Sequence, residues 1–173
     1  MLTVFALKSI CPHTRTAVLE KYVEPLNAAF DEWEINTPQR QAAFLAQVAH
    51  ESGGFHYVRE IASGEAYEGR KDLGNTQPGD GIRFKGRGLI QLTGRANYAA
   101  CSAALGVDFV SEPELLTLPE NAARSAGWFW WTRKLSKLAD AENFRAITLR
   151  INGGLNGYAD RLAYWERAKE ALA

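Results

Sequence analysis

The chain has 173 residues, 46% of them hydrophobic, which is enough for one substantial buried core and too few for two large domains. We therefore expect residues 1–173 to fold as a single domain. Its 20 basic and 20 acidic residues are spread along the chain and give a formal net charge of +0, which argues against nucleic acid or anionic lipid as partners.

The first ten residues are largely apolar but carry Lys8, and the apolar run is too short for a secretory signal peptide. No later run is long enough to span a bilayer. We therefore expect a protein that is made without a signal peptide and does not insert into membranes. Cys11 and Cys101 are far apart and lack metal-ligand spacing. This favours two reduced thiols in packing roles, as in a reducing compartment.

Capping residues and apolar periodicity predict six helices in chain order, at residues 12–33, 38–52, 94–105, 119–135, 141–151 and 159–172. Ten of the fifteen glycines lie between Gly53 and Gly94, and other turn-forming residues are frequent in the same stretch. This pattern predicts a mainly α (α+β) fold in which one small strand-and-loop lobe interrupts a helical body. Such an arrangement implies a cleft between the two parts, which is a common place for a ligand site.

The helix predicted at 38–52 ends in the most informative motif of the chain, His50-Glu51-Ser52-Gly53-Gly54. Glu51 falls on the same apolar stripe as Phe44 and Val48, so its carboxyl is expected to face the core. Burial and the negative end of a helix both disfavour the charged form of a carboxyl, which suits a general acid. The alternative is a structural carboxylate that closes a buried polar network or pairs with Arg59.

Other catalytic motifs are incomplete. A zinc site of the H-E-x-x-H type needs a second histidine where Gly54 stands, and Gly86-Arg87-Gly88 completes neither a dinucleotide fingerprint nor a phosphate loop. No histidine is accompanied by a nucleophile-elbow pattern. The sequence therefore predicts catalysis without a metal and without another cofactor.

The chain contains three ordered blocks: AQVAHESGGF at 46–55, FKGRGLIQLTG at 84–94, and INGGLNG at 151–157 followed by Asp160-Arg161. Together they resemble glycoside hydrolase family 19, the group of plant and bacterial chitinases, and most closely its compact phage and prophage endolysins. The resemblance covers nearly the whole chain and implies a lysozyme-like fold. It also implies roles for three residues: Glu51 as general acid, Glu60 as the second catalytic carboxylate, and Thr93 as a group that helps to hold the attacking water.

The same resemblance implies a set of side chains that bind substrate in the sugar groove or tune the two acids, namely His50, Gln91, Tyr98, Asn152 and Arg161. Amide and hydroxyl groups suit the hydroxyl and N-acetyl groups of amino sugars. A guanidinium near Glu60 would keep that carboxylate ionised.

Two of the catalytic assignments have competitors. Glu65 and Glu68 lie in the same loop and compete with Glu60 for the role of second carboxylate. Thr93 stands just before a predicted helix and would also be a good N-cap.

Binding residues have simpler interpretations as well. Asn152 would serve merely to end a helix before a glycine, and Arg161 would pair with Asp160 or Glu166 on a solvated face. The aromatic run at 128–131 looks like a sugar-stacking platform, but four consecutive aromatics point all round a helix. We therefore favour core packing for this run.

These observations predict a peptidoglycan-degrading endolysin, a muramidase that hydrolyses β-1,4 bonds between amino sugars by a two-carboxylate, inverting mechanism. We expect a monomer that is made in a bacterial cytoplasm and acts on the glycan strands of periplasmic or cell-wall peptidoglycan after release. The alternatives are a family 19 chitinase and a non-catalytic glycan-binding protein of a wall or tail. Secreted chitinases of the family usually carry disulfides or a binding module, and this sequence shows neither.

Overall fold

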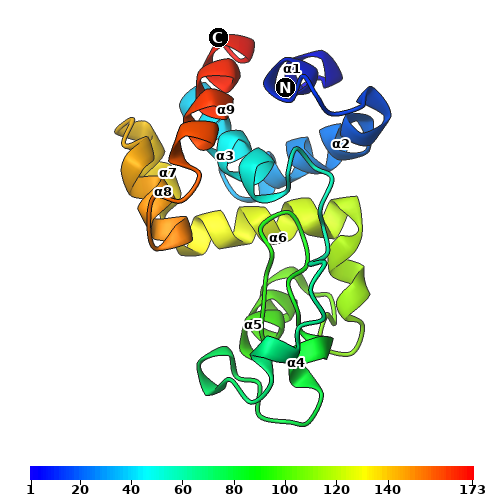
Figure 1. Ribbon diagram of the computed structural model, residues 1–173. Helices are drawn as coiled ribbons and strands as arrows, with labels where there is room; N and C mark the ends of the chain where they lie inside the picture. Colours follow the sequence, from blue (N-terminus) through cyan, green and yellow to red (C-terminus); the bar gives the residue numbers. More distant parts are fainter.

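The computed structural model describes residues 1–173 and consists almost entirely of helices (Figure 1). Seven α-helices form a helical body: α1 (Val4–Ile10), α2 (Thr16–Glu32), α3 (Pro38–Glu51), α6 (Pro119–Thr132), α7 (Leu135–Asp140), α8 (Phe144–Asn152) and α9 (Tyr158–Ala171). The chain between α3 and α6 forms a small lobe with α4 (Asp80–Arg83), α5 (Arg95–Leu105) and the 3-10 turns η1 (Glu65–Tyr67), η2 (Lys71–Leu73) and η3 (Pro113–Thr117). In Figure 1, α6 crosses the middle, with the other body helices above it and α4 and α5 below. None of these helices is long and apolar enough to cross a membrane.

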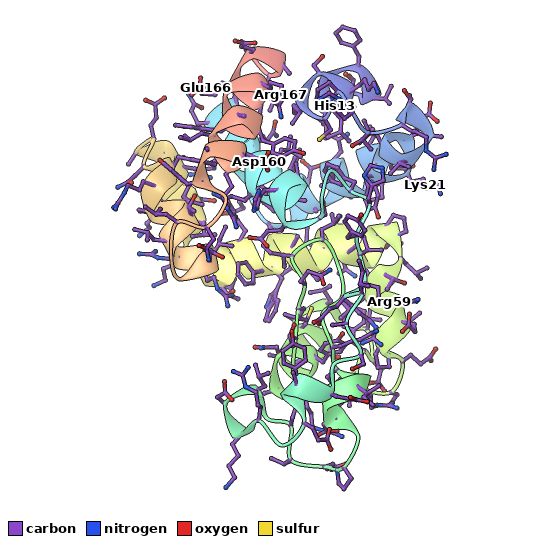
Figure 2. All side chains as sticks on the ribbon, viewed as in Figure 1. His13, Lys21, Arg59, Asp160, Glu166 and Arg167 are labelled. Carbon is purple, nitrogen blue, oxygen red and sulfur yellow. The ribbon has the colours of Figure 1, made fainter.

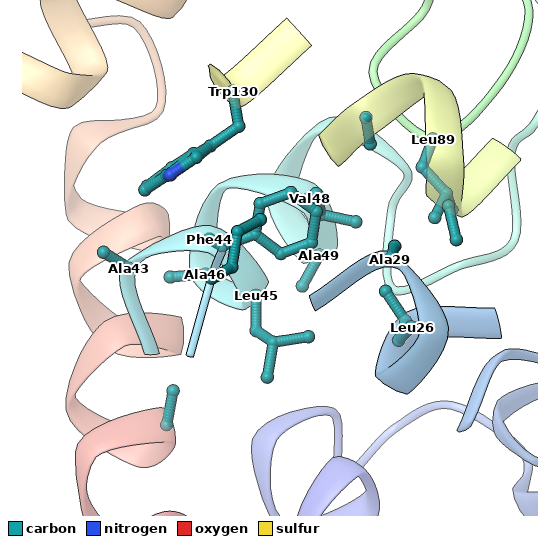
Figure 3. Packing of buried hydrophobic residues seen from close by; sticks show 14 of the residues in the cluster. Leu26, Ala29, Ala43, Phe44, Leu45, Ala46, Val48, Ala49, Leu89 and Trp130 are labelled. Carbon is teal, nitrogen blue, oxygen red and sulfur yellow. The ribbon is translucent and has the colours of Figure 1, made fainter. Parts of the chain in front are cut away.

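Helix α3 lies at the centre of the body. Thr37 caps its beginning by accepting the N–H of Arg40 at 3.2 Å. Every residue from Ala42 to Ala49 is buried, and α9 is the most extensive partner of the helix. Figure 3 shows Phe44 packed beside Trp130 of α6, with the two rings edge to face at a centroid distance of 5.5 Å. The helix is therefore buried on more than the predicted stripe, which makes it a rigid support for the residue at its end.

The glycine pair ends α3 as the sequence predicts. Gly53 and Gly54 adopt φ values of +56° and +70°, in the left-handed region that favours glycine. A Cβ atom on Gly54 would lie 2.5 Å from Thr14 Oγ1, so the chain also passes the turn before α2 too closely for a side chain. The backbone turns sharply here and leads from the end of α3 into the small lobe.

The strands predicted for the small lobe are reduced to isolated bridges. Arg59 pairs with Arg87, and Arg87 pairs with Leu92. The lobe has an apolar cluster of its own with seven buried residues: Phe84, Leu92, Tyr98, Cys101, Leu105, Phe109 and Leu116. Glycines and charged residues interrupt the apolar alternation in this stretch. The backbone groups therefore form hydrogen bonds with side chains rather than the regular ladder of a β-sheet.

The six predicted helices are present, but some of their ends differ. The sequence predicts one helix over 12–33, whereas the structure has a turn at 11–15 and begins α2 at Thr16. The predicted helix over 119–135 is divided, because Lys134 adopts a left-handed φ of +54° between α6 and α7. Helices α1, α4 and α7 are not predicted, since four to seven residues are too few for a clear apolar period.

Both cysteines are buried free thiols. Burial raises the pKa of Cys11 and of Cys101 to about 12, so both thiols keep their protons. The predicted packing role of the two cysteines is confirmed.

Candidate active site

Glu51, the last residue of α3, forms an ion pair with Arg161 of α9, and 2.6 Å separates Glu51 Oε1 from Arg161 Nη2. Arg161 is only 1% exposed, and its guanidinium also donates to Gln47 Oε1 and to the carbonyl of Asn156. Gln47 in turn donates to Thr148 Oγ1 at 2.8 Å. The Glu51 side chain keeps 23% of its surface exposed. This network holds the carboxyl group, and the exposed part of the side chain remains accessible to a ligand.

The prediction for Arg161 needs correction. The sequence suggests a groove-lining guanidinium near Glu60, or else a surface pair with Asp160 or Glu166. Arg161 is instead buried and does not reach the surface, and it orients the Glu51 carboxyl from the protein interior. The pairing follows from the packing of α9 along α3, which no local pattern in the sequence describes.

Of the two structural alternatives for Glu51, the buried polar network is present, and the pair with Arg59 is wrong. Arg59 forms its ion pair with Glu114 of η3. Figure 2 shows Arg59 on the part of the chain that enters the small lobe, whereas Asp160 lies on α9 beside α3. The Arg59 guanidinium therefore forms its ion pair within the small lobe, and the Arg161 guanidinium forms its ion pair within the helical body.

Glu60 belongs to the small lobe and is held at both carboxyl oxygens. Oε1 accepts the hydroxyl of Tyr67 at 2.9 Å, and Oε2 accepts the backbone N–H of Gly86 at 2.9 Å. The Glu60 N–H also donates to the Gly86 carbonyl at 2.8 Å. A Cβ atom at position 86 would lie 3.1 Å from Glu60 Oε2 and 2.7 Å from Gln91 Oε1, so glycine permits this close approach. Neither Tyr67 nor this use of Gly86 was identified from the sequence.

The two competing carboxylates are separated by their contacts. Glu68 accepts the N–H of Gly79 at 2.7 Å and that of Gly81 at 2.8 Å, so both of its oxygens stabilise the start of α4. Glu65 is exposed at the start of η1. Glu60 is half-buried and shares a loop pairing with the 84–94 block. These positions favour Glu60 over its competitors.

Thr93 and Gln91 lie on the turn that follows Gly86. The Thr93 hydroxyl donates to the Gln91 carbonyl at 2.9 Å, and the Gln91 side-chain amide donates to the Gly88 carbonyl at 3.1 Å. The N-cap of α5 is Gly94, without a side-chain bond, so the capping interpretation of Thr93 is wrong. Both side chains are half-buried, and their roles toward water and substrate stay predictions.

Tyr98 does not line a surface. It is 0% exposed, and its ring packs on Phe84 with a centroid distance of 5.1 Å. Its hydroxyl donates to the Lys85 carbonyl at 2.6 Å and accepts from Arg87 Nη1 at 2.9 Å. The prediction that Tyr98 binds substrate is therefore wrong, because the core of the small lobe covers it.

The remaining predicted binding residues lie at the ends of helices. His50 Nδ1 is 2.7 Å from Asp160 Oδ2, and the ring lies against Gly157, where a Cβ atom would be 2.2 Å from His50 Cε1. Asn152 is the last residue of α8, and Gly153 follows in the left-handed conformation, as the helix-ending interpretation expects. Its side-chain nitrogen is buried without a hydrogen-bond partner. Substrate binding by His50 and Asn152 stays a prediction.

The aromatic run is mostly core, as the sequence favours. Trp130 is 1% exposed and Phe129 is 9% exposed, and both belong to the main apolar cluster. Trp128 is partly buried against the same cluster. Trp131 alone faces solvent, at 57% exposure. The structure also places no group of three or more His, Cys, Asp or Glu side chains where they could hold a metal ion.

Residues 27–148 match the family described as chitinase class I, glycoside hydrolase family 19. A glycosyl hydrolase family 19 domain-containing protein of Haemophilus influenzae is 31% identical over 192 residues, covering 93% of this chain and 92% of that protein. The chain belongs to glycoside hydrolase family 19. Membership makes it a glycosidase with chitinase-like relatives.

Other relatives differ in length. An endochitinase of Arabidopsis thaliana is 40% identical over 114 residues, covering 65% of this chain but only 39% of the plant protein. A bacterial family 19 chitinase of known structure aligns with a TM-score of 0.79 and 24% identity, covering 99% of this chain and 94% of that chain. This likeness concerns the fold, and it confirms the predicted mainly helical, lysozyme-like architecture.

Proposed function

We propose that this family 19 glycosidase cleaves β-1,4 bonds between the amino sugars of bacterial peptidoglycan, with Glu51 as general acid and Glu60 as general base. The observation that carries the proposal is the arrangement of two carboxylates on different parts of the fold. Glu51 ends a buried helix of the body, and Glu60 lies in the small lobe, each held by fixed partners. Glycosidases use such a pair on the two sides of the scissile bond.

The proton balance of the reaction fits these contacts. Glu51 gives its proton to the glycosidic oxygen as the bond to the anomeric carbon breaks, and Glu60 takes a proton from the water that attacks that carbon. Arg161 lies against Oε1 of Glu51, and we assign Oε2 as the oxygen that presents the proton. Each Glu60 oxygen accepts one hydrogen bond and keeps a second lone pair for water. Thr93 and Gln91, on the neighbouring turn, help to hold that water.

Peptidoglycan is supported as the substrate by the resemblance of the three sequence blocks to the compact phage and prophage endolysins. A chitinase is the second candidate, favoured by the names of the plant relatives and of the bacterial structure. Both substrates contain β-1,4-linked amino sugars, so the site chemistry is the same.

Product analysis distinguishes the two substrates. Purified murein sacculi and chitin hexamer would be incubated with equal amounts of enzyme, and the products identified by mass spectrometry. We expect muropeptides with muramic acid at the reducing end and weak or no turnover of chitin hexamer. Efficient cleavage of the hexamer with untouched murein would establish the chitinase instead.

The proposed mechanism also predicts the stereochemistry. A water between the two carboxyls requires a separation of roughly 6.5–9.5 Å between them in the substrate complex and inverts the anomeric configuration. Proton NMR during the first minutes of hydrolysis would show the α-anomer of the new reducing end. Initial appearance of the β-anomer would contradict the two-carboxylate inverting mechanism.

We further propose that the enzyme acts as a monomer, is made in a bacterial cytoplasm and reaches the wall after release, as an endolysin does. Two buried, unpaired thiols support folding in a reducing compartment. Size-exclusion chromatography with light scattering would test the monomer. Expression in a bacterium with and without a membrane-permeabilising protein tests the route, since lysis is expected only when the membrane is opened.

A further inference from the structure

The peptide group between Lys85 and Gly86 is hydrogen-bonded on both sides. Its N–H, which belongs to Gly86, donates to Glu60 Oε2 at 2.9 Å. Its carbonyl, which belongs to Lys85, accepts the Tyr98 hydroxyl at 2.6 Å and Arg87 Nη1 at 3.3 Å. One peptide unit therefore connects a buried tyrosine and a buried arginine to the proposed catalytic base.

Arg87 is itself firmly held. It is 5% exposed, and its Nε and Nη2 donate to Glu114 Oε1 at 3.0 and 2.8 Å. Its Nη1 donates to the Arg83 carbonyl at 2.8 Å and to the Tyr98 hydroxyl at 2.9 Å. The positive charge thus lies beside the tyrosine and reaches the Lys85 carbonyl both directly and through the tyrosine hydroxyl.

All donors in this series of hydrogen bonds point toward Glu60. Arg87 donates to Tyr98, Tyr98 donates to the Lys85 carbonyl, and the N–H of the same peptide donates to Glu60. Hydrogen bonds in such a series polarise one another, so a bond accepted at a peptide carbonyl strengthens the bond donated by its N–H. Burial raises the pKa of Tyr98 to about 12, so the hydroxyl keeps its proton and stays a donor.

We propose that Tyr98 and Arg87 are positioning residues for Glu60, acting through the Lys85–Gly86 peptide to hold the carboxylate in place and to stabilise its charge. The proposal rests on the assignment of Glu60 as the general base. In this arrangement the guanidinium expected near Glu60 is that of Arg87, in place of Arg161, and it contacts the Lys85–Gly86 peptide both directly and through Tyr98. A purely structural Tyr98 would support the small lobe through its ring and would have no specific effect on Glu60.

We call this series of hydrogen bonds from Arg87 and Tyr98 to Glu60 the relay. Removal of the Tyr98 hydroxyl tests it, because Tyr98→Phe keeps the ring that packs on Phe84. The loss of one hydrogen bond of ordinary strength is expected to lower kcat about threefold to tenfold. KM should change less than twofold, since Tyr98 is buried and touches no substrate. Tyr22→Phe is the matched control, because Tyr22 is also buried but lies in the helical body. Its kcat should equal that of the wild type.

The amide proton of Gly86 provides a direct readout by NMR. In the wild type this proton is expected at low field because it donates to a carboxylate, and in Tyr98→Phe it should move upfield. Glu60→Gln should move the same signal further, since the charged acceptor is removed. Glu114→Gln, a change at a half-exposed residue that holds Arg87, should give a smaller shift in the same direction and a smaller loss of kcat.

The outcomes separate the relay from the proposed function. If Glu60→Gln keeps wild-type activity, Glu60 is not the base and the proposed mechanism fails. If Glu60→Gln is inactive while Tyr98→Phe leaves both kcat and the Gly86 signal unchanged, the relay alone is wrong. A loss of kcat in Tyr98→Phe that also appears in Tyr22→Phe, or that comes with an unmoved Gly86 signal, would reduce Tyr98 to a structural residue.

Discussion

The helical body and the small lobe are held together in different ways. The main apolar cluster of 31 buried residues lies in the body, with Phe55, Leu89 and Ile90 of the lobe packed into it, whereas the lobe's own cluster has seven. The lobe compensates with buried polar groups, since Asn75, Asp80 and Arg87 are each at most 5% exposed and all are hydrogen-bonded. Glu51 is therefore placed by packed helices and by the buried Arg161 on one of them, and Glu60 by hydrogen bonds within the lobe. Burial of apolar surface is non-directional, whereas hydrogen bonds specify the positions of particular atoms.

The largest expected effect concerns the proton donor on the body side. Glu51→Gln removes the proposed acid, and general acid catalysis contributes roughly 10²–10⁴-fold, so lysis of permeabilised cells should fall by at least about 10²-fold. Glu60→Gln should cost nearly as much, and Thr93→Ala less, because other groups still hold the water. Turbidity assays give the rates. Thermal unfolding is the control: a collapsed melting temperature in Glu51→Gln, or lysis at a near-normal rate, would make Glu51 a structural residue.

The second effect is the loss in free energy of unfolding when the same substitution is made in each of the two cores. Phe44 in the body and Phe84 in the lobe are both 0% exposed. Phe44→Ala should lower the free energy of unfolding by about 3–5 kcal/mol, as expected for a phenylalanine in a well-packed core. Phe84→Ala should lower it less, roughly 2–3 kcal/mol, because a small cluster relaxes more easily around a cavity. Urea unfolding measures both values, and equal losses would argue against the difference between the cores.

Hydrogen exchange sharpens this contrast. In Phe84→Ala, amide protection should fall mainly in the small lobe, while the amides of α3 keep most of theirs. Phe44→Ala should reduce protection throughout the chain. Uniform loss in both variants would show that the two parts unfold as one cooperative unit.

A third effect tests the ion pair between Asp80 and Arg95 in the lobe. Asp80 accepts from Arg95 Nη2 at 2.6 Å and from Arg95 Nε at 2.8 Å, with its side chain 2% exposed. Removing one partner of a fully buried pair costs about 3–5 kcal/mol, but Arg95 keeps 26% of its side chain exposed, so we expect about 1–3 kcal/mol for Asp80→Asn. Calorimetry gives the value. Asp31→Asn, on the exposed surface of α2, is the control and should be near neutral.

The smallest effect is the pH dependence of the lobe. The hydrogen bonds from Arg95 lower the pKa of Asp80 in the folded state, so this pair contributes stability above the unfolded pKa of about 3.9. The contribution is lost as the pH falls through the lowered pKa. The wild type should therefore lose protection of the lobe amides below about pH 4, ahead of the body. In Asp80→Asn this part of the acid dependence should be absent, and its persistence would assign it to other carboxylates.

Local signals in the sequence account for much of the body. The cap at Thr37, the apolar period through Phe44 and the glycine pair at 53–54 predict α3 nearly to the residue, and with it the place of Glu51. In the lobe, glycines and turn residues predict irregular structure, but not the bridges that replace the expected strands. Short helices such as α4 and α7 escape prediction because one turn carries too little periodicity.

The sequence by itself therefore determined the helical architecture, the family and the candidate carboxylates, because caps, periods and motifs act over a few neighbouring residues. Only the tertiary structure decided which side chains hold those carboxylates. Arg161 meets Glu51 because α9 packs on α3, and Gly86 meets Glu60 because two loop segments pair. Likewise, Tyr98 is buried because the lobe closes over it. Such contacts depend on the packing of segments far apart in the chain, and no spacing within one segment encodes them.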